Sequence, residues 1–131
     1  MLSTPILLDY QSSTPCSKDV VDSMKPFWSE IFSNPASKSN LAGINASAIL
    51  EASREKIEQN LFLKNKKVIF TSGATESNNL ALLGFARNYH KKTGNYGHII
   101  TLKTEHKAVL EPLYQLKKEG FMVTEITPER D

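Results

Sequence analysis

Residues 71–76 (Thr-Ser-Gly-Ala-Thr-Glu) are mostly small or hydroxyl-bearing, and they join an expected strand to an expected helix. The first N–H groups of a helix lack partners within it and carry the positive end of its dipole, so an anion is stabilised there. Gly73 and Ala74 leave space for a ligand. The hydroxyls of Ser72 and Thr75 can donate to phosphate oxygens. The alternative is capping of the helix by a hydroxyl without a ligand. The run matches neither the dinucleotide fingerprint nor the P-loop.

A second polar junction, residues 104–107 (Thr-Glu-His-Lys), follows the next expected strand. In a parallel sheet both junctions emerge at the carboxyl edge, where open α/β sheets bind ligands, so His106 is expected to face an anion at the first junction. An imidazole there can stack on a planar ring and exchange protons near neutral pH. The alternative is a histidine that starts a helix and bonds to the backbone. Lys107 is expected to be a solvated lysine rather than a Schiff-base lysine.

The single cysteine, Cys16, excludes an internal disulfide and a multi-cysteine metal site. It lies next to the helix cap Ser17, where the helix dipole favours a thiolate, but no histidine is near it in sequence. We therefore expect an incidental small residue rather than a nucleophile. The three histidines lie eight residues apart, too far for the ligand spacing of one helix or strand, so no metal site is expected.

The elements that must position the two junctions alternate between strand and helix patterns. The expected order is a strand over 68–71, a helix ending near 93–94, a strand over 98–102, a helix closed by Gly120 and a strand over 121–126. Such connections make right-handed crossovers and a mostly parallel sheet with helices on its faces, so the fold class is α/β. Pro112 is expected in the first turn of its helix, where a missing N–H costs little.

The sequence before residue 67 predicts an arm followed by helices. We expect a short strand over 6–8, a turn over 12–15 and a helix from Ser17 that Pro26 kinks or ends. A loop over 33–40 and a long helix from about Leu41 to Leu61 are expected to follow. Residues 1–131 thus divide into an N-terminal arm with helices over 1–66 and a βαβαβ part over 67–131. Three strands make half a sheet, and the chain stops directly after a strand, so we expect a truncated domain.

Composition excludes several classes of function. The 131 residues carry 16 Lys+Arg and 14 Asp+Glu with a net charge of +2, and no basic stripe supports a nucleic-acid or membrane-surface partner. No apolar run approaches the roughly 20 residues of a membrane helix, and the N-terminus lacks the pattern of a secretory signal. With one cysteine in addition, a cytoplasmic location is the expectation.

Four blocks of the sequence together resemble the N-terminal part of cysteine desulfurases of the NifS/IscS type. These enzymes belong to the class V aminotransferase group and have the type I fold of pyridoxal-phosphate enzymes. The blocks occur in the family's order at compatible spacing, and they are residues 8–10 with 13–15, 34–37, 70–81 and 104–110. The resemblance covers the whole chain but only about the first third of a family member. It implies a truncated part of the large domain, with a mostly parallel sheet and flanking helices.

The resemblance also implies a cofactor, a reaction and the roles of four residues. The cofactor is pyridoxal 5′-phosphate, an electron sink that the protein orients. Ala74 and Thr75 match positions that contact its phosphate, and Gly73 belongs to the same cofactor-binding loop. His106 matches a histidine that stacks on the pyridine ring and takes part in proton transfer, so it is the candidate catalytic residue. The implied reaction takes sulfur from L-cysteine, leaving L-alanine and an enzyme persulfide that feeds iron–sulfur cluster assembly. Implied partners are sulfur acceptor or scaffold proteins and a second subunit of a homodimer.

Several family positions differ or have no counterpart. Ser33 stands for a glycine and Asn40 for a histidine near the substrate entrance. This chain lacks four further features of the family: the Schiff-base lysine of a later Ser-x-His-Lys segment, the carboxylate that pairs with the pyridinium nitrogen, the later Asn and Gln ligands, and the persulfide cysteine. Lys107 does not match the Schiff-base lysine, and Cys16 does not match the persulfide cysteine. Because the covalent anchor and the ring's charge partner are missing, we expect the chain by itself to be inactive.

Two other interpretations stay open. One is a non-catalytic fragment that pairs with a full-length relative through its N-terminal helices. The other is a segment of a different class V enzyme, such as a selenocysteine lyase or an aminotransferase; the block at 104–110 favours a desulfurase.

Overall fold

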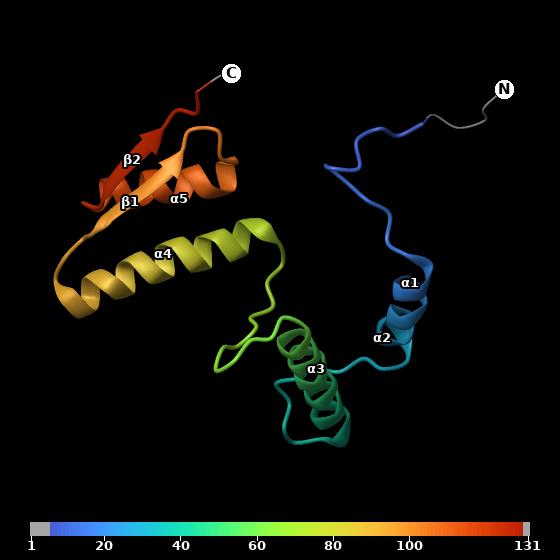
Figure 1. The fold of residues 1–131 in the computed structure, drawn as a ribbon. Coiled ribbons are helices and arrows are strands. Elements are labelled where there is room, and N and C mark those ends of the chain that lie inside the picture. The colour runs from blue at the N-terminus through green and yellow to red at the C-terminus, as the bar shows by residue number, and fades with distance from the viewer. Residues whose placement is uncertain (1–5, 130–131) are drawn as a thin grey trace. The chain divides into compact units, whose positions relative to one another are not determined.

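The computed structural model describes residues 6–129 of the chain (Figure 1). The chain forms two compact units, Met1–Val68 and Ile69–Asp131, which are described separately below. Within residues 6–129, no helix is both long enough and apolar enough to cross a membrane.

The first unit contains three helices, α1 (Lys18–Met24), α2 (Pro26–Ser29) and α3 (Leu41–Asn60). Pro26 is the first residue of α2, so it divides the helical pattern as predicted, because a proline is tolerated at that position. Asn40 caps α3 by accepting from the Gly43 N–H at 2.8 Å. A Cβ on Gly43 would lie 2.2 Å from the carbonyl oxygen of Ser37, so only glycine allows the loop before α3 to approach it.

The strand expected over residues 6–8 is wrong. These residues form no strand, and Leu8 is 91% exposed. A strand needs a neighbour to take its backbone hydrogen bonds, and the part of the chain that the structure describes offers none to this segment. The turn lies slightly earlier than expected, with the Ser12 N–H bonded to the Asp9 carbonyl at 3.2 Å.

The strand expected over residues 68–71 is also wrong, and side chains of α3 give the reason at its first residue. The Val68 N–H donates to Glu58 Oε1 at 2.9 Å, and the Val68 carbonyl accepts from the Arg54 guanidinium. Both backbone groups that a neighbouring strand would use are therefore occupied by side chains. Among residues 6–129 the sheet has two strands rather than the expected three.

The second unit contains α4 (Ala74–Thr93), β1 (His98–Leu102), α5 (Lys107–Lys118) and β2 (Met122–Ile126). β1 and β2 pair in parallel, with His98 opposite Met122 and Leu102 opposite Ile126. The α/β class and the parallel pairing are confirmed. α4 ends at Gly94, whose φ of 74° is the left-handed conformation that glycine adopts easily.

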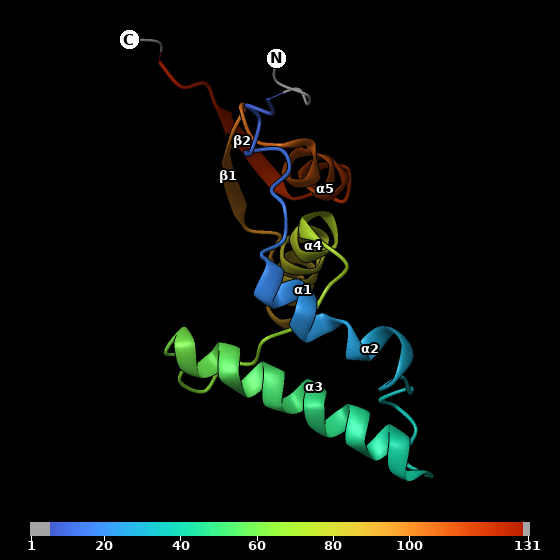
Figure 2. The same ribbon diagram turned by 90° about the vertical axis from the view of Figure 1, so that its right-hand side faces the viewer.

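Both helices of the second unit lie on the same side of the sheet (Figures 1 and 2). The buried centre between them is small, and it is formed by Ala86, Leu113, Leu116 and Phe121, with Ile99 and Val123 packed against it. The other sheet face is open, since Ile100 and Met122 are each 62% exposed. The expected flanking helices are confirmed, and the described residues of this unit supply them to one face.

The end of α5 explains how β2 is positioned. Gly120 has a φ of 107°, its N–H donates to the Lys117 carbonyl at 3.2 Å, and the Phe121 N–H donates to the Leu116 carbonyl at 3.0 Å. This paired arrangement is the Schellman motif, and it turns the chain so that Phe121 packs against Leu116.

The expected place of Pro112 is wrong. It is the sixth residue of α5, inside the helix, because the helix already begins at Lys107. A proline there removes one backbone bond, to the carbonyl of Ala108 four residues earlier. Pro112 is buried beside Leu113, so burial against the unit outweighs the local preference.

Candidate functional site

The first polar junction leaves the beginning of α4 open. Gly73 is the N-cap, and having no side chain it cannot accept from the first N–H groups of the helix. Among residues 6–129, no side-chain oxygen accepts from the backbone N–H of Ala74 or Thr75. A Cβ on Gly73 would meet nothing within 4 Å, and its φ of 160° is extended backbone that any residue adopts. Neither packing nor backbone conformation requires a glycine at this position.

Glu76 draws Ser72 back toward the helix. Its Oε2 accepts from both the backbone N–H and the hydroxyl of Ser72, each at 2.6 Å. Both bonds lower the pKa of the Glu76 carboxyl below its usual value of 4.5, and the bond from the Ser72 hydroxyl has the larger effect. The hydroxyls of Thr71 and Ser77 bond to each other at 2.6 Å across the same junction. Ser72, predicted to donate to a phosphate, donates to Glu76 instead, which leaves Thr75 as the hydroxyl at the start of α4.

His106 caps the second helix of the site. It is the N-cap of α5, and its Nδ1 accepts from the Ala108 N–H at 3.0 Å. The backbone-bonded histidine that the sequence left as an alternative is therefore what the structure contains. Because Nδ1 acts as an acceptor, the neutral ring carries its proton on Nε2, the opposite edge of the imidazole.

Thr75 and His106 line one cavity of about 380 Å³ between the first turns of α4 and α5. Its polar lining consists of Thr75, Asn79, His106, Lys107, Glu111 and Gln115. The structure therefore brings the two junctions together, but not for the predicted reason: no strand precedes the first junction among residues 6–129, and the packing of α4 against α5 places the two helix starts side by side. Gly73 and Ala74 lie at the very start of α4, just ahead of the lining residues. The volume falls in the range of about 300–1,000 Å³ that small-molecule sites occupy.

The sequence reasoning missed three polar lining residues, Asn79, Glu111 and Gln115. The side-chain amide of Asn79 donates to the Thr75 carbonyl at 2.8 Å, in the first turns of α4. Thr75 and Asn79 are four residues apart, as are Glu111 and Gln115, so each pair shares one face of its helix. This spacing was the signal that could have found them.

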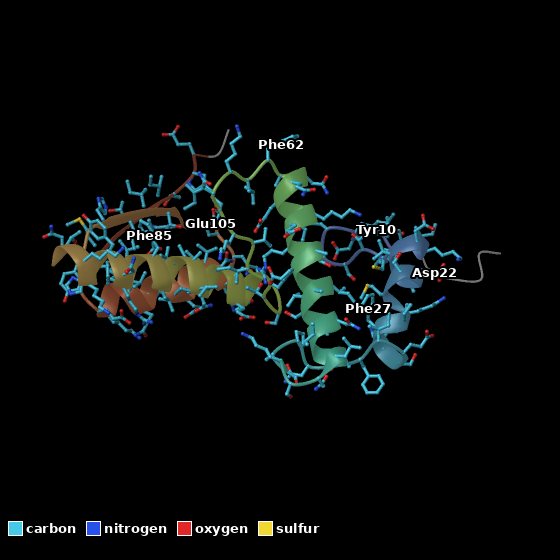
Figure 3. The ribbon with its side chains drawn as sticks, turned by 90° about the horizontal axis from the view of Figure 1, so that it is seen from below. Tyr10, Asp22, Phe27, Phe62, Phe85 and Glu105 are labelled. Atoms are coloured by element: carbon cyan, nitrogen blue, oxygen red, sulfur yellow. The ribbon has the colours of Figure 1, made fainter. Side chains whose placement is uncertain are left out.

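A larger cavity of about 610 Å³ contains none of the predicted site residues. It lies between α4 and the start of β1, and aromatic residues dominate it, among them Phe85, Tyr89, Tyr96 and Phe121. Phe85 on α4, labelled in Figure 3, is 75% exposed there. The smaller cavity has the groups that can hold an anion or move a proton, so it is the candidate site.

Other residues singled out from the sequence lie elsewhere. Cys16, Ser33 and Asn40 belong to the first unit, and Cys16 is exposed as a free thiol. Lys107 lines the cavity beside His106 and contributes a positively charged side chain to it, while Glu111 contributes a negatively charged one. Among residues 6–129, no three side chains of His, Cys, Asp or Glu gather as metal ligands do.

Comparison with known proteins gives consistent results. The model of the aminotransferase class-V family matches residues 6–131. The cysteine desulfurase IscS of Anaeromyxobacter sp. (strain Fw109-5) is 42% identical over 130 residues, which are 99% of this chain and 31% of that protein. The cysteine desulfurase IscS of Neisseria meningitidis serogroup C is 46% identical over 123 residues, covering 94% of this chain and 30% of that protein.

Solved structures extend the similarity to three dimensions. A NifS-like protein superimposes with a TM-score of 0.79 at 36% identity, over 90% of this chain and 31% of the other. A structure described as SspA in complex with cysteine has a TM-score of 0.78 at 40% identity, over 92% and 34%. The chain thus spans about a third of the length of the proteins that it matches.

Proposed function

The chain belongs to the aminotransferase class-V family, and from this premise we propose that it forms the N-terminal part of a cysteine desulfurase that uses pyridoxal 5′-phosphate. The observation that carries the proposal is the shared cavity of Thr75 and His106 at the starts of α4 and α5. The names of relatives at 42% and 46% identity favour a desulfurase over a selenocysteine lyase or an aminotransferase.

The residues present fit the phosphate of this cofactor. The backbone N–H groups of Ala74 and Thr75 and the Thr75 hydroxyl are donors at the positive end of the α4 dipole. Gly73 has no Cβ to stand in the way of a phosphate at these groups, and a Cβ built there would meet none of the described atoms within 4 Å. The ammonium group of Lys107 adds a positive charge to the same cavity.

His106 is proposed to orient the ring and to move a proton. When bound, pyridoxal phosphate supplies the electron sink for cleaving bonds next to an amino-acid amine. The bond from Ala108 to Nδ1 fixes the tilt of the imidazole, so its face is presented in one orientation. Nε2 holds the ring proton, and it is the atom through which we propose that His106 gives or takes one.

The proposed substrate is L-cysteine, in line with the solved relative described in complex with cysteine. The proposed partners are sulfur acceptor or scaffold proteins and a second subunit of a homodimer, and the proposed compartment is the cytoplasm. The 131 residues contain no Ser-x-His-Lys segment, so the chain by itself is proposed to bind the cofactor weakly and without turnover.

Titration of the purified chain with pyridoxal 5′-phosphate, followed by absorbance and fluorescence, tests this proposal. Thr75→Ala removes a hydroxyl donor to a charged group and is expected to weaken binding roughly tenfold. Thr127→Ala removes an exposed threonine after β2 and is the matched control, with unchanged affinity expected. Pyridoxal without the phosphate should bind both variants and the unaltered chain alike. Equal affinity of Thr75→Ala and the unaltered chain for the phosphorylated cofactor would contradict the proposed site.

A second function, pairing with a full-length relative, is favoured by exposed aromatic residues of the first unit. Trp28 is 67% and Phe32 73% exposed, and Phe32 lines a cavity of about 480 Å³ together with Phe27. Exposed apolar groups of this kind mark interaction surfaces. Co-purification with a full-length desulfurase that is lost in Trp28→Ser would support pairing, and retained co-purification would exclude this surface.

A further inference from the structure

Glu76 occupies an unusual place for an acidic residue beside an anion site. It is the third residue of α4, and its carboxylate does not cap its own helix but reaches back to the residue before the N-cap. Both donors of Ser72, the backbone N–H and the hydroxyl, converge on the same oxygen, Oε2, at 2.6 Å each. The junction is therefore tied to the first turn of α4 by one side chain.

Two consequences of this contact oppose each other. The negative charge of Glu76 repels a nearby anion, and by this effect alone its removal would strengthen phosphate binding. The two bonds, in contrast, hold residues 72–73 folded back, so that the start of α4 stays uncovered. Without them Ser72 is released, and its hydroxyl becomes free to bond to the N–H groups that a phosphate needs.

The contacts of the Ser72 hydroxyl favour the second consequence. Serine is among the residues that cap helices best, and Ser72 lies one position before the N-cap. Its hydroxyl is nevertheless bonded to Glu76 and not to the helix N–H groups. The bond between Thr71 and Ser77 at 2.6 Å holds the other side of the same junction. The loop is thus held by side chains in a conformation that leaves its N–H donors unused.

We propose that Glu76 is a positioning residue, which holds Ser72 away from the start of α4 and so keeps the N–H groups of Ala74 and Thr75 available to a phosphate group. This inference rests on the proposed function, because it gives Glu76 a task at the same site. Glu76 is not proposed to touch the phosphate.

The test measures binding of inorganic phosphate and of pyridoxal 5′-phosphate to the full chain, from the NMR shifts of the Ala74 and Thr75 amides. Glu76→Ala is expected to weaken binding about threefold to tenfold although it removes a repelling charge. Glu76→Gln keeps an acceptor oxygen without the charge and is expected to restore most of the affinity. Glu129→Ala removes an exposed carboxylate outside the site and should leave the affinity unchanged.

The outcomes separate the two proposals. If the unaltered chain binds phosphate and Glu76→Ala binds it equally well or more tightly, charge prevails and the positioning role is wrong. If the amides of the unaltered chain do not respond to phosphate, the proposed function fails and the inference fails with it. Should Glu76→Ala unfold, Glu76→Gln decides between the two roles, because it keeps an acceptor oxygen for Ser72 and removes the charge. The positioning role predicts an affinity for Glu76→Gln at or slightly below that of the unaltered chain, whereas a purely electrostatic role predicts clearly tighter binding.

Discussion

The two ends of the helix pair in the second unit differ in how their backbone groups are satisfied. At the closed end, residues 90–97 and 116–121, the α5 terminus is completed by the Schellman bonds of Gly120 and Phe121. Tyr96 stacks on His90 with 4.0 Å between ring centroids, and it meets Phe121 edge-on at 5.1 Å. At the site end, residues 71–76 and 104–108, exposed polar side chains surround a cavity, and no side chain of the described residues caps the N–H donors at the start of α4.

The two ends therefore serve different purposes within one small unit. Apolar burial and glycine turns at the closed end hold α4 and α5 together, and the packed helices place Thr75 and His106 on one cavity at the other end. The site end needs few stabilising contacts of its own, and its unsatisfied donors can serve a ligand. Changes at the closed end should therefore alter stability, and changes at the site end should alter binding.

The largest effect is expected from Leu116→Ala at the closed end. Leu116 is fully buried, so the substitution leaves a cavity and should destabilise the second unit by about 2–5 kcal/mol. Urea unfolding, monitored through hydrogen exchange of the β1 amides, reports on this unit alone. The control is Phe85→Ala, a larger truncation at a 75% exposed position, which should cost less than about 1 kcal/mol. Equal losses from the two would show that α5 does not form the core.

A smaller loss of stability is expected from Gly120→Ala. The φ of 107° strains any residue with a Cβ, and the new Cβ would lie 3.2 Å from two ring carbons of Tyr96. We expect a loss of about 1–2 kcal/mol in the same unfolding experiment. Gly84→Ala is the matched control, because Gly84 lies inside α4 with nothing within 4 Å, and alanine there should stabilise by about 0.5–1 kcal/mol. Destabilisation by both variants would contradict the comparison.

Gly73→Ser should separate binding from stability at the site end. A serine at the N-cap can accept from the N–H groups of the first turn, so stability should stay within a few tenths of a kcal/mol or rise. The same bond removes donors from a phosphate, and the affinity for pyridoxal 5′-phosphate should fall about threefold or more. Thermal unfolding and cofactor titration of one preparation measure both. If the variant is stable and keeps full affinity, the phosphate does not bind at the start of α4.

The smallest effect concerns pH at the closed end. Glu119 accepts from Arg87 at 2.5 and 3.0 Å and from Gln115 at 2.9 Å, and these bonds lower the pKa of its carboxyl from 4.5 to about 2. A lowered folded-state pKa means that the contribution is complete above about pH 4.5 and is lost as the pH falls toward 2. The difference in unfolding midpoint between the unaltered chain and Glu119→Gln should therefore shrink over this interval. A difference that is constant with pH would show that the pair adds no stability.

Local sequence rules predicted most elements of this chain. The strand His98–Leu102, the start of α3 near Leu41, the break at Pro26 and the glycine endings at Gly94 and Gly120 all follow from short-range patterns. Each depends on the backbone preference of a residue or on apolar spacing within one element, and these properties travel with the sequence. Thr75 and His106 line one cavity as predicted, but the prediction rested on a strand over 68–71 that is absent among the described residues, and the packing of α4 against α5 brings the two residues together instead.

The predictions that were wrong concern residues whose structure depends on contacts with distant parts of the chain, which a local sequence pattern does not contain. The run from Val68 has a strand composition, but a strand exists only beside another, and α3 took the backbone groups of Val68. Pro112 lies inside a helix, where proline is normally unfavourable, because its burial beside Leu113 offsets the missing backbone hydrogen bond. Asn79 and Gln115 became site residues only when α4 and α5 were placed against each other.

Which side chains can bind an anion or move a proton follows from the amino-acid sequence, because residue type and position at a helix start set those abilities. How these groups are used depends on the packing of the chain: the Ser72 hydroxyl donates to Glu76, and Nδ1 of His106 accepts from the Ala108 N–H, which leaves the proton of the neutral ring on Nε2. A hydroxyl or an imidazole has several possible partners of similar strength, and the choice among them depends on which atoms the packed helices bring within reach.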